Sequence, residues 1–180
     1  MRMKKGTKWK AGIIAMAVTI ALGASSVVTY ATGYGTDSKQ TIPAEGDYVD
    51  EDGNYIQFEM SLEELGLTED DIIIPVGTAD NASTRSANGH IDAWSIPSNK
   101  TAKAGSFKKN VNDTISLCVT IIPTNKTAQA GIILPNGNAV CIQGTGTLSG
   151  TFTCPSTGYY WVYVRNLSDT TVIANGSYTY

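Results

Sequence analysis

The segment Gly158-Tyr159-Tyr160-Trp161-Val162-Tyr163-Val164-Arg165-Asn166 decides the fold of this chain of 180 residues. Side chains alternate between the two faces of a β-strand, so Tyr160, Val162 and Val164 share one face. The opposite face carries Tyr159, Trp161, Tyr163 and Arg165. No other run in the chain is so strongly β-forming. The segment therefore predicts a central strand with one aliphatic face and one aromatic face.

Short β-prone runs separated by polar turns continue this pattern from Gly89 to the last residue. Thr114–Ile122 alternates between an aliphatic and a polar face, and Asn136-Gly137 is a hairpin signal between residues 129–134 and 139–143. The other predicted strands cover residues 90–96, 103–108, 148–154 and 171–180. Six to eight short strands without a long helix predict an all-β fold, an antiparallel β-sandwich or jelly roll, over residues 89–180.

The first 31 residues have the organisation of a secretory signal peptide. Five basic residues lie within residues 2–10, and a largely apolar run covers residues 11–24. Thr29-Tyr30-Ala31 matches a cleavage site, with Ala24-Ser25-Ser26 as an alternative. An uncleaved membrane anchor is the other interpretation, because the run can be extended to about twenty residues. Small and polar residues near its end favour cleavage, so we expect a secreted or cell-surface protein that meets a membrane only if the leader is retained.

Charge is distributed unevenly along the remaining chain. The whole sequence carries −3, and loss of the five basic residues of the leader takes it to −8. Residues 37–80 contain thirteen acids and one lysine, whereas residues 81–180 contain three acids and seven basic residues. Residues 32–88 are therefore an acidic arm and linker before a mildly basic body. Because the basic residues of the body are scattered, we do not expect nucleic acid as a partner.

Two local patterns lie within the arm. Asp52-Gly53 is a turn signal between short β-prone pieces, which predicts a small hairpin. Residues 61–64 form a capping box, and Gly66 ends the resulting helix after little more than a turn. These patterns favour a short structured spacer. The alternative is a pro-segment that docks on the basic body and is later removed.

A family resemblance rests on the opening strand and the residues before it, Thr151-Phe152-Thr153-Cys154-Pro155-Ser156-Thr157. This stretch resembles the last third of the pre-peptidase C-terminal domains of secreted bacterial proteins. Those domains carry a strand, a short glycine turn and the pattern G-x-Y-x-V-x-V, matched here by Gly158, Tyr160, Val162 and Val164. The resemblance covers about residues 131–180 and implies a sandwich fold in an exported bacterial protein.

Residues that could support catalysis or metal binding are sparse. His90 is the only histidine, and although Asp92 is close, no second imidazole is available for a metal site or a hydrolase triad. No G-x-S-x-G, Walker or Cys-x-x-Cys motif occurs. The acidic runs 50–52 and 69–71 lie in polar turns, where solvated carboxylates are expected. We therefore predict no catalytic residue, no metal site, no cofactor and no enzymatic activity.

The three cysteines lie in the body, where export would permit a disulfide. Strand parity places Cys118 and Cys141 on polar faces, and Cys154 on the inward face. We predict a Cys118–Cys141 disulfide if their strands are neighbours, with Cys154 buried and free. Proximity in sequence favours Cys141–Cys154 instead, and three reduced thiols are the third alternative.

The aromatic face is the predicted binding surface. Planar rings on a rigid sheet suit sugar rings or a protein partner. The predicted ligand-binding residues are Tyr159, Trp161, Tyr163, Arg165 and, if the last strand pairs alongside, Tyr178. The alternative is that residues 47–74 or the second sheet cover this face. We therefore expect a secreted binding module for a carbohydrate or a protein; the rival is an exported precursor that releases a toxin-like domain when its acidic arm is cleaved.

Overall fold

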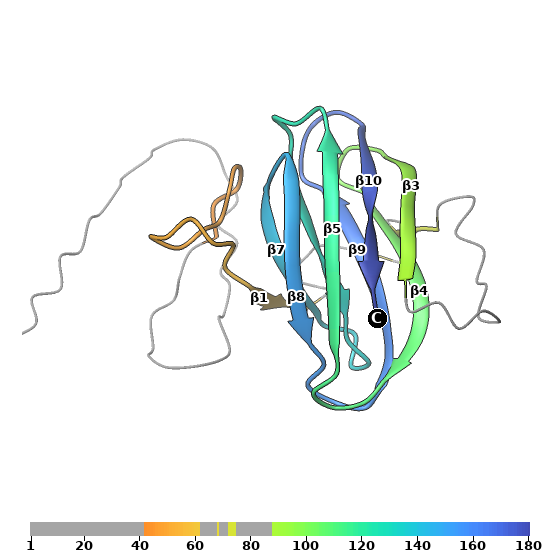
Figure 1. Ribbon diagram of the computed structural model, residues 1–180. Helices are drawn as coiled ribbons and strands as arrows, with labels where there is room; N and C mark the ends of the chain where they lie inside the picture. Colours follow the sequence, from red (N-terminus) through yellow and green to blue (C-terminus); the bar gives the residue numbers. More distant parts are fainter. Residues whose placement is uncertain (1–41, 62–67, 69–71, 75–87) are drawn as a thin grey trace, which may run out of the picture.

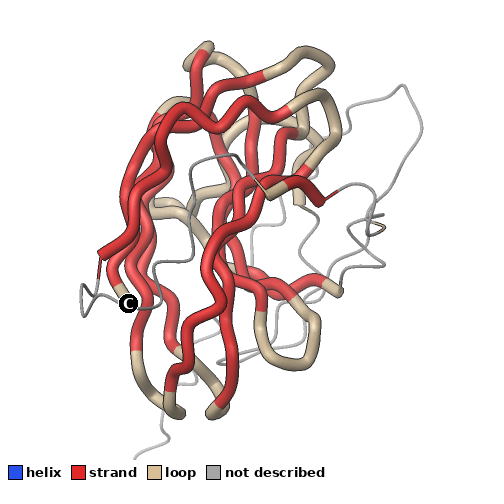
Figure 2. The backbone as a smooth tube through the Cα atoms, turned by 90° about the vertical axis from the view of Figure 1, so that its right-hand side faces the viewer, coloured by secondary structure: helices blue, strands red, loops and turns tan. Residues whose placement is uncertain are grey.

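The computed structural model describes residues 42–61, 68, 72–74 and 88–180. In this part of the chain all regular structure is β-strand (Figure 1, Figure 2). The strands are β1 (Phe58–Met60), β2 (Ile72–Ile73), β3 (Asn88–Ile96), β4 (Thr101–Lys109), β5 (Thr114–Ile122), β6 (Thr127–Ile133), β7 (Ala139–Thr145), β8 (Thr147–Thr153), β9 (Gly158–Asn166) and β10 (Val172–Thr179).

The strands form two sheets packed face to face (Figure 1). One sheet has six strands in the order β1-β7-β6-β9-β4-β2, and the other has four in the order β3-β10-β5-β8. All neighbours are antiparallel except the short β2, which runs parallel to β4. The predicted all-β sandwich is confirmed.

Most predicted strands appear with small shifts at their ends. The bounds of β5 and β9 agree with the sequence prediction, and β6 and β7 form the predicted hairpin. Gly137 has a φ of 90° at the tip of this hairpin, a conformation that glycine adopts without steric cost. The amide of Leu134 donates to the carbonyl oxygen of Asn138 at 2.8 Å and closes the loop.

The inward face of β9 lies at the centre of the core between the sheets. Tyr160, Val162 and Val164 are fully buried, as the alternation predicts. They belong to one apolar cluster with side chains of the four-stranded sheet such as Ile115 and Phe152. The hydroxyl of Tyr160 donates to the carbonyl oxygen of Ser156 at 2.6 Å, so its burial leaves no polar group without a partner.

The acidic arm contributes strands to the six-stranded sheet. β1 pairs with β7 at one edge, and β2 pairs with β4 at the opposite edge. The hairpin predicted at Asp52-Gly53 is present as a bridge between Val49 and Tyr55 around a tight turn. The turn projects away from the sandwich (Figure 1).

Several predictions concern residues outside the described ranges. They are the signal peptide of residues 1–31, the short helix after Ser61, and most of the linker of residues 78–88. Within the described ranges no helix has the length and apolarity needed to cross a membrane.

Candidate functional site

The candidate site is the outer face of the six-stranded sheet, where the outward side chains of β9 meet those of its neighbours. Tyr163 lies in register between Gly131 of β6 and Lys103 of β4. Trp161 lies one row along, between Ile133 and Gly105. Three strands therefore present a continuous surface whose middle rows carry Tyr163 and Trp161.

The arm covers one part of this surface. Only 1% of Tyr163 is exposed, and it belongs to a second apolar cluster that lies outside the main core. The other buried members of that cluster are Ile42, Tyr48, Phe58, Met60, Ile133, Ala139 and Cys141. At Tyr163 the face is covered by the arm, which was one of the two alternatives left open by the sequence.

Buried polar contacts hold the arm on the sheet. Gln143 of β7 is 1% exposed, and its Nε2 donates to the carbonyl oxygen of Pro43 at 2.7 Å. Its Oε1 accepts from Nε2 of Gln129 on β6 at 3.1 Å. The amide of Gly46 donates to Oγ1 of Thr127 at 2.9 Å. These bonds pair most of the polar groups between the arm and the sheet, where a buried unpaired polar atom is costly; Gln129 Oε1 is a buried atom that has no hydrogen-bond partner in the described residues.

Further arm contacts reach the end of β7 and the edge of β8. Asp47 Oδ1 accepts from the amide and hydroxyl of Thr145, at 2.6 and 3.0 Å. Nε2 of Gln57 donates to the carbonyl oxygen of Thr151 at 2.8 Å, and the hydroxyl of Tyr55 donates to the carbonyl oxygen of Thr147 at 3.3 Å. The last two bonds occupy acceptors on an edge strand, which would otherwise be open to pairing with another chain.

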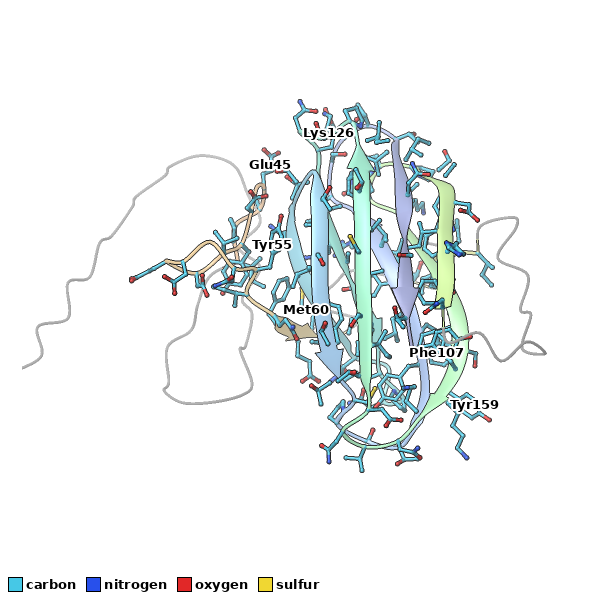
Figure 3. All side chains as sticks on the ribbon, in the orientation of Figure 1. Glu45, Tyr55, Met60, Phe107, Lys126 and Tyr159 are labelled. Atoms are coloured by element: carbon cyan, nitrogen blue, oxygen red, sulfur yellow. The ribbon has the colours of Figure 1, made fainter. Side chains whose placement is uncertain are left out.

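The other part of the face is open. Tyr159 is 55% exposed, and Trp161 is partly exposed and packs against the edge of the second apolar cluster. Nζ of Lys103 lies 5.4 Å from the centre of the Trp161 ring, and Lys108 lies opposite Tyr159 on β4. We call Tyr159, Trp161, Lys103 and Lys108 the open strip. Figure 3 shows Tyr159 at the edge of the sandwich, away from the arm residues Glu45 and Tyr55.

The two lysines of the open strip differ from Lys109 and Lys126 in their ion pairing. Lys109 pairs with Asp113 at 3.7 Å, and Lys126 pairs with Asp169 at 3.0 Å. Within the described ranges, neither Lys103 nor Lys108 has a carboxylate at ion-pair distance. The open strip therefore combines two aromatic rings with two positive charges that no described acidic side chain neutralises.

Arg165 and Tyr178, the remaining predicted site residues, have different positions. Arg165 lies on the same face of β9, opposite Gln129, and its charge lowers the pKa of the neighbouring Cys141 and Tyr163 against the larger effect of burial. The prediction that Tyr178 joins the aromatic face is wrong. β10 belongs to the other sheet, where Tyr178 is buried and stacks on Phe107 with ring centres 6.0 Å apart.

The predicted Cys118–Cys141 disulfide is also wrong, since all three cysteines are free thiols. Cys118 and Cys141 do lie on outward faces, as parity indicated, but β5 and β7 belong to different sheets. Outward-facing side chains of different sheets lie on opposite sides of a sandwich, so the two sulfurs cannot meet. Burial raises the pKa of Cys141 to about 12. Cys154 is buried and free, as predicted.

The titratable groups show no assembled catalytic or metal centre in the described ranges. No group of three or more His, Cys, Asp or Glu side chains in those ranges could hold a metal ion. His90 and Asp92 are both exposed on the edge strand β3.

Comparisons with known proteins return little. No family model matches the chain. No curated protein matches it either. One similar solved structure is the crystal structure of Aeromonas hydrophila PliG, a periplasmic lysozyme inhibitor of g-type lysozyme; it is 14% identical, with a TM-score of 0.39, and the match covers 60% of this chain and 96% of that one. The resemblance of residues 131–180 to pre-peptidase C-terminal domains stays a prediction.

Proposed function

We propose that this chain is an exported, non-enzymatic binding module whose open strip contacts an acidic surface of a protein partner at the cell exterior. The observation that carries the proposal is the exposure of Tyr159 and Trp161 beside Lys103 and Lys108, two cations without a carboxylate partner in the described ranges. Export rests on the signal-peptide pattern of residues 1–31.

The physical argument is that of an interface hot spot. Tyrosine and tryptophan bury large areas for the loss of only two side-chain torsions, and β9 holds both rings on a rigid strand. Positive charges beside such anchors steer an acidic partner toward them and suppress binding of basic proteins. A carbohydrate is the alternative ligand for this strip, because sugar rings also stack on aromatic side chains. Lys103 and Lys108, which have no carboxylate partner in the described ranges, favour the protein.

The proposal is tested by selecting displayed random peptides on the purified chain. We expect the selected peptides to be acidic, to lose affinity as salt rises, and to bind at least tenfold more weakly to Tyr159→Ala and Lys103→Ala variants. Val111→Ala is the matched control, because Val111 is another exposed apolar side chain, outside the open strip. Peptides without acidic enrichment, or equal binding by all variants, would overturn the proposal.

A precursor is the second candidate function, favoured by the covering of Tyr163 by the arm. Cleavage in residues 78–88 would free the arm from the body, and its dissociation would expose the face that now lies under Tyr48 and Phe58. N-terminal sequencing of the secreted protein tests this. A start between residues 78 and 88 supports a precursor, whereas a start near Thr32 excludes removal of the arm.

A further inference from the structure

The outer face of the four-stranded sheet is distinct from the open strip and lies on the other side of the sandwich. Its outward positions on β5, β8 and β10 carry no charged residue, although 16% of the chain is charged. They are mainly hydroxyl-bearing or amide side chains: Thr114, Ser116, Thr120, Thr147, Ser149, Thr151, Thr153, Asn175, Ser177 and Thr179. The part of the face formed by β5, β8 and β10 therefore offers many hydrogen-bonding groups without net charge.

Some of these hydroxyls bond across the strands and are thereby fixed in position. Ser116 Oγ lies 2.9 Å from Thr151 Oγ1, and Thr120 Oγ1 lies 3.0 Å from Thr147 Oγ1. A hydroxyl that donates one bond keeps acceptor capacity for another. A ligand would therefore meet preorganised groups and would not have to order them on binding.

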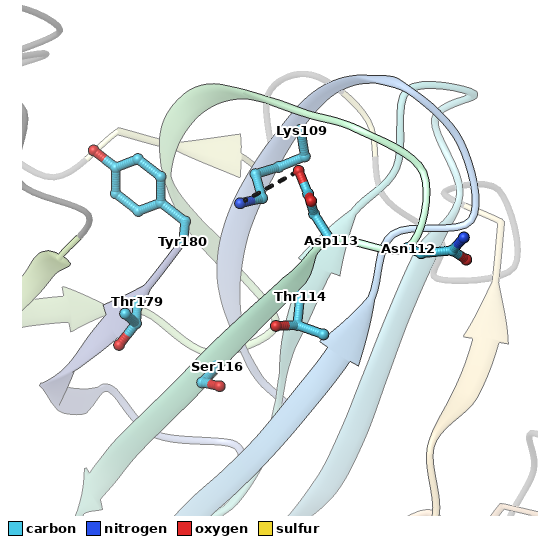
Figure 4. A pocket seen from close by; sticks show the side chains of 7 residues that line it. All are labelled: Lys109, Asn112, Asp113, Thr114, Ser116, Thr179 and Tyr180. Carbon is cyan, nitrogen blue, oxygen red and sulfur yellow. Dashed lines mark ion pairs between the residues drawn. The ribbon is translucent and has the colours of Figure 1, made fainter.

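A shallow groove of about 460 Å³ lies at one end of this face, where β5 begins and β10 ends (Figure 4). The hydroxyls of Thr114, Ser116 and Thr179 line one part of it. Tyr180 lies on one side, and the Lys109–Asp113 ion pair lies on the other (Figure 4). The groove thus brings together one aromatic ring, a row of hydroxyls and a carboxylate.

The charges of the groove are balanced, but the carboxylate still offers an acceptor. Asp113 Oδ2 accepts from the amide of Asn110 at 2.8 Å and lies 3.7 Å from Nζ of Lys109. Both of these contacts use the same oxygen, and 39% of the Asp113 side chain is exposed. Within the described residues Oδ1 accepts no hydrogen bond, and hydrogen bonds to a charged acceptor are stronger than those to a neutral one.

The aromatic ring is held by packing from behind. Tyr180 stacks on Phe107 with ring centres 4.4 Å apart and planes 18° apart, and Tyr178 lies beside both. Tyr180 nevertheless stays partly exposed. Tyr180 packs against the main core cluster, so its ring is held in place and little side-chain entropy remains to be lost when a ligand contacts its exposed part.

We propose that this groove binds a neutral sugar unit of a carbohydrate chain. The Tyr180 ring would stack on the apolar face of the sugar, Asp113 would accept from its hydroxyls, and Thr114 and Ser116 would complete the hydrogen bonds. Neutral sugars have the two properties that the groove matches, an apolar ring face and many uncharged hydroxyls. The balanced Lys109–Asp113 pair gives no advantage to an anionic or a cationic ligand.

Affinity electrophoresis through gels that contain a soluble neutral polysaccharide tests the proposal, with dextran, mannan, xyloglucan and mixed-linkage β-glucan as probes. We expect at least one of them to retard the full chain. Ser116→Lys, which places a long cation in the groove, should weaken this retardation at least tenfold. Ser149→Lys is the matched control, because it makes the same change on the same face, outside the groove.

Each outcome of the electrophoresis either supports or overturns the sugar-binding groove. Retardation that Ser116→Lys abolishes and Ser149→Lys preserves supports the groove. No retardation by any probe, or equal effects of the two variants, overturns it. Tyr159→Ala is run beside them; loss of retardation in that variant alone would place the sugar on the open strip, which also overturns this proposal. The peptide selection described above involves another surface, so the two proposals fail independently.

Discussion

Replacing Gln143 by leucine is the sharpest test of how the arm is held. Gln143 accepts from Gln129 at 3.1 Å and donates to the carbonyl oxygen of Pro43 at 2.7 Å. The variant leaves both partner groups without their bond. A buried polar group that loses its partner costs about 1–3 kcal/mol. The Gln129 amide is deeply buried and belongs at the upper end of that range, whereas the Pro43 carbonyl is partly exposed and belongs at the lower end.

Leucine recovers about 1 kcal/mol through its larger apolar surface. We therefore expect Gln143→Leu to lower the free energy of unfolding by about 2–3 kcal/mol, measured by urea denaturation followed by circular dichroism. The variant should also make the arm a faster substrate for limited proteolysis, because the same bonds hold residues 43–46 in place.

Gln57→Leu is the matched control for this prediction. Gln57 also donates one hydrogen bond from the arm to the body, to Thr151, but it does so at an exposed site. Water replaces a lost bond there, so the expected cost is at most about 1 kcal/mol. If Gln143→Leu costs no more than Gln57→Leu, the buried amide pair does not anchor the arm and the reasoning is refuted.

Three other outcomes follow from the structure. Ellman's reagent at pH 8 should label Cys118 in the folded protein but not Cys141, because Cys141 is buried and its pKa of about 12 leaves almost no thiolate. Labelling of both thiols would contradict the burial of Cys141. Gly131→Ala should lower the free energy of unfolding in urea by about 3 kcal/mol, because the new Cβ would lie 2.1 Å from a backbone oxygen of β7. Gly137→Ala has open space around it and should cost only about 1 kcal/mol, for the positive φ at that position. Asp50 has a lowered pKa because backbone amides of its own turn donate to its carboxylate, so an NMR titration should place that pKa below the usual value of about 3.9. As pH falls through this pKa, the carboxylate is protonated and the turn loses the stabilisation that these hydrogen bonds provide.

The sequence predicted elements well where the information is local. The bounds of β5 and β9, the Asn-Gly hairpin and the inward row of Tyr160, Val162 and Val164 all follow from alternation and turn chemistry. Alternation states which of two faces a side chain takes, because the period of a strand is two residues. It contains no information on which sheet the strand joins.

The wrong predictions share this cause. Cys118 and Cys141 were correctly placed on outward faces, yet their strands lie in different sheets. Tyr178 was grouped with β9, although β10 pairs with β3 and β5. Sheet membership is set by long-range pairing, and no short-range signal in these strands specifies it. The hydroxyl-rich face and its groove could not be predicted either, since they arise from three strands that become neighbours only in the fold.

The opening strand is the reason that we propose a function for the open strip. A two-layer sandwich buries only one face of each sheet, so a strand that is apolar on both faces needs a third layer. This chain provides one at Tyr163, where the arm contributes its own aromatic side chains and its buried amide contacts. The same strand keeps Tyr159 55% exposed, and opposite it on β4 lies Lys108, which has no carboxylate partner in the described ranges. An exposed aromatic ring on a rigid strand gains by contact with a further surface, and in our proposal the lysines select an acidic one.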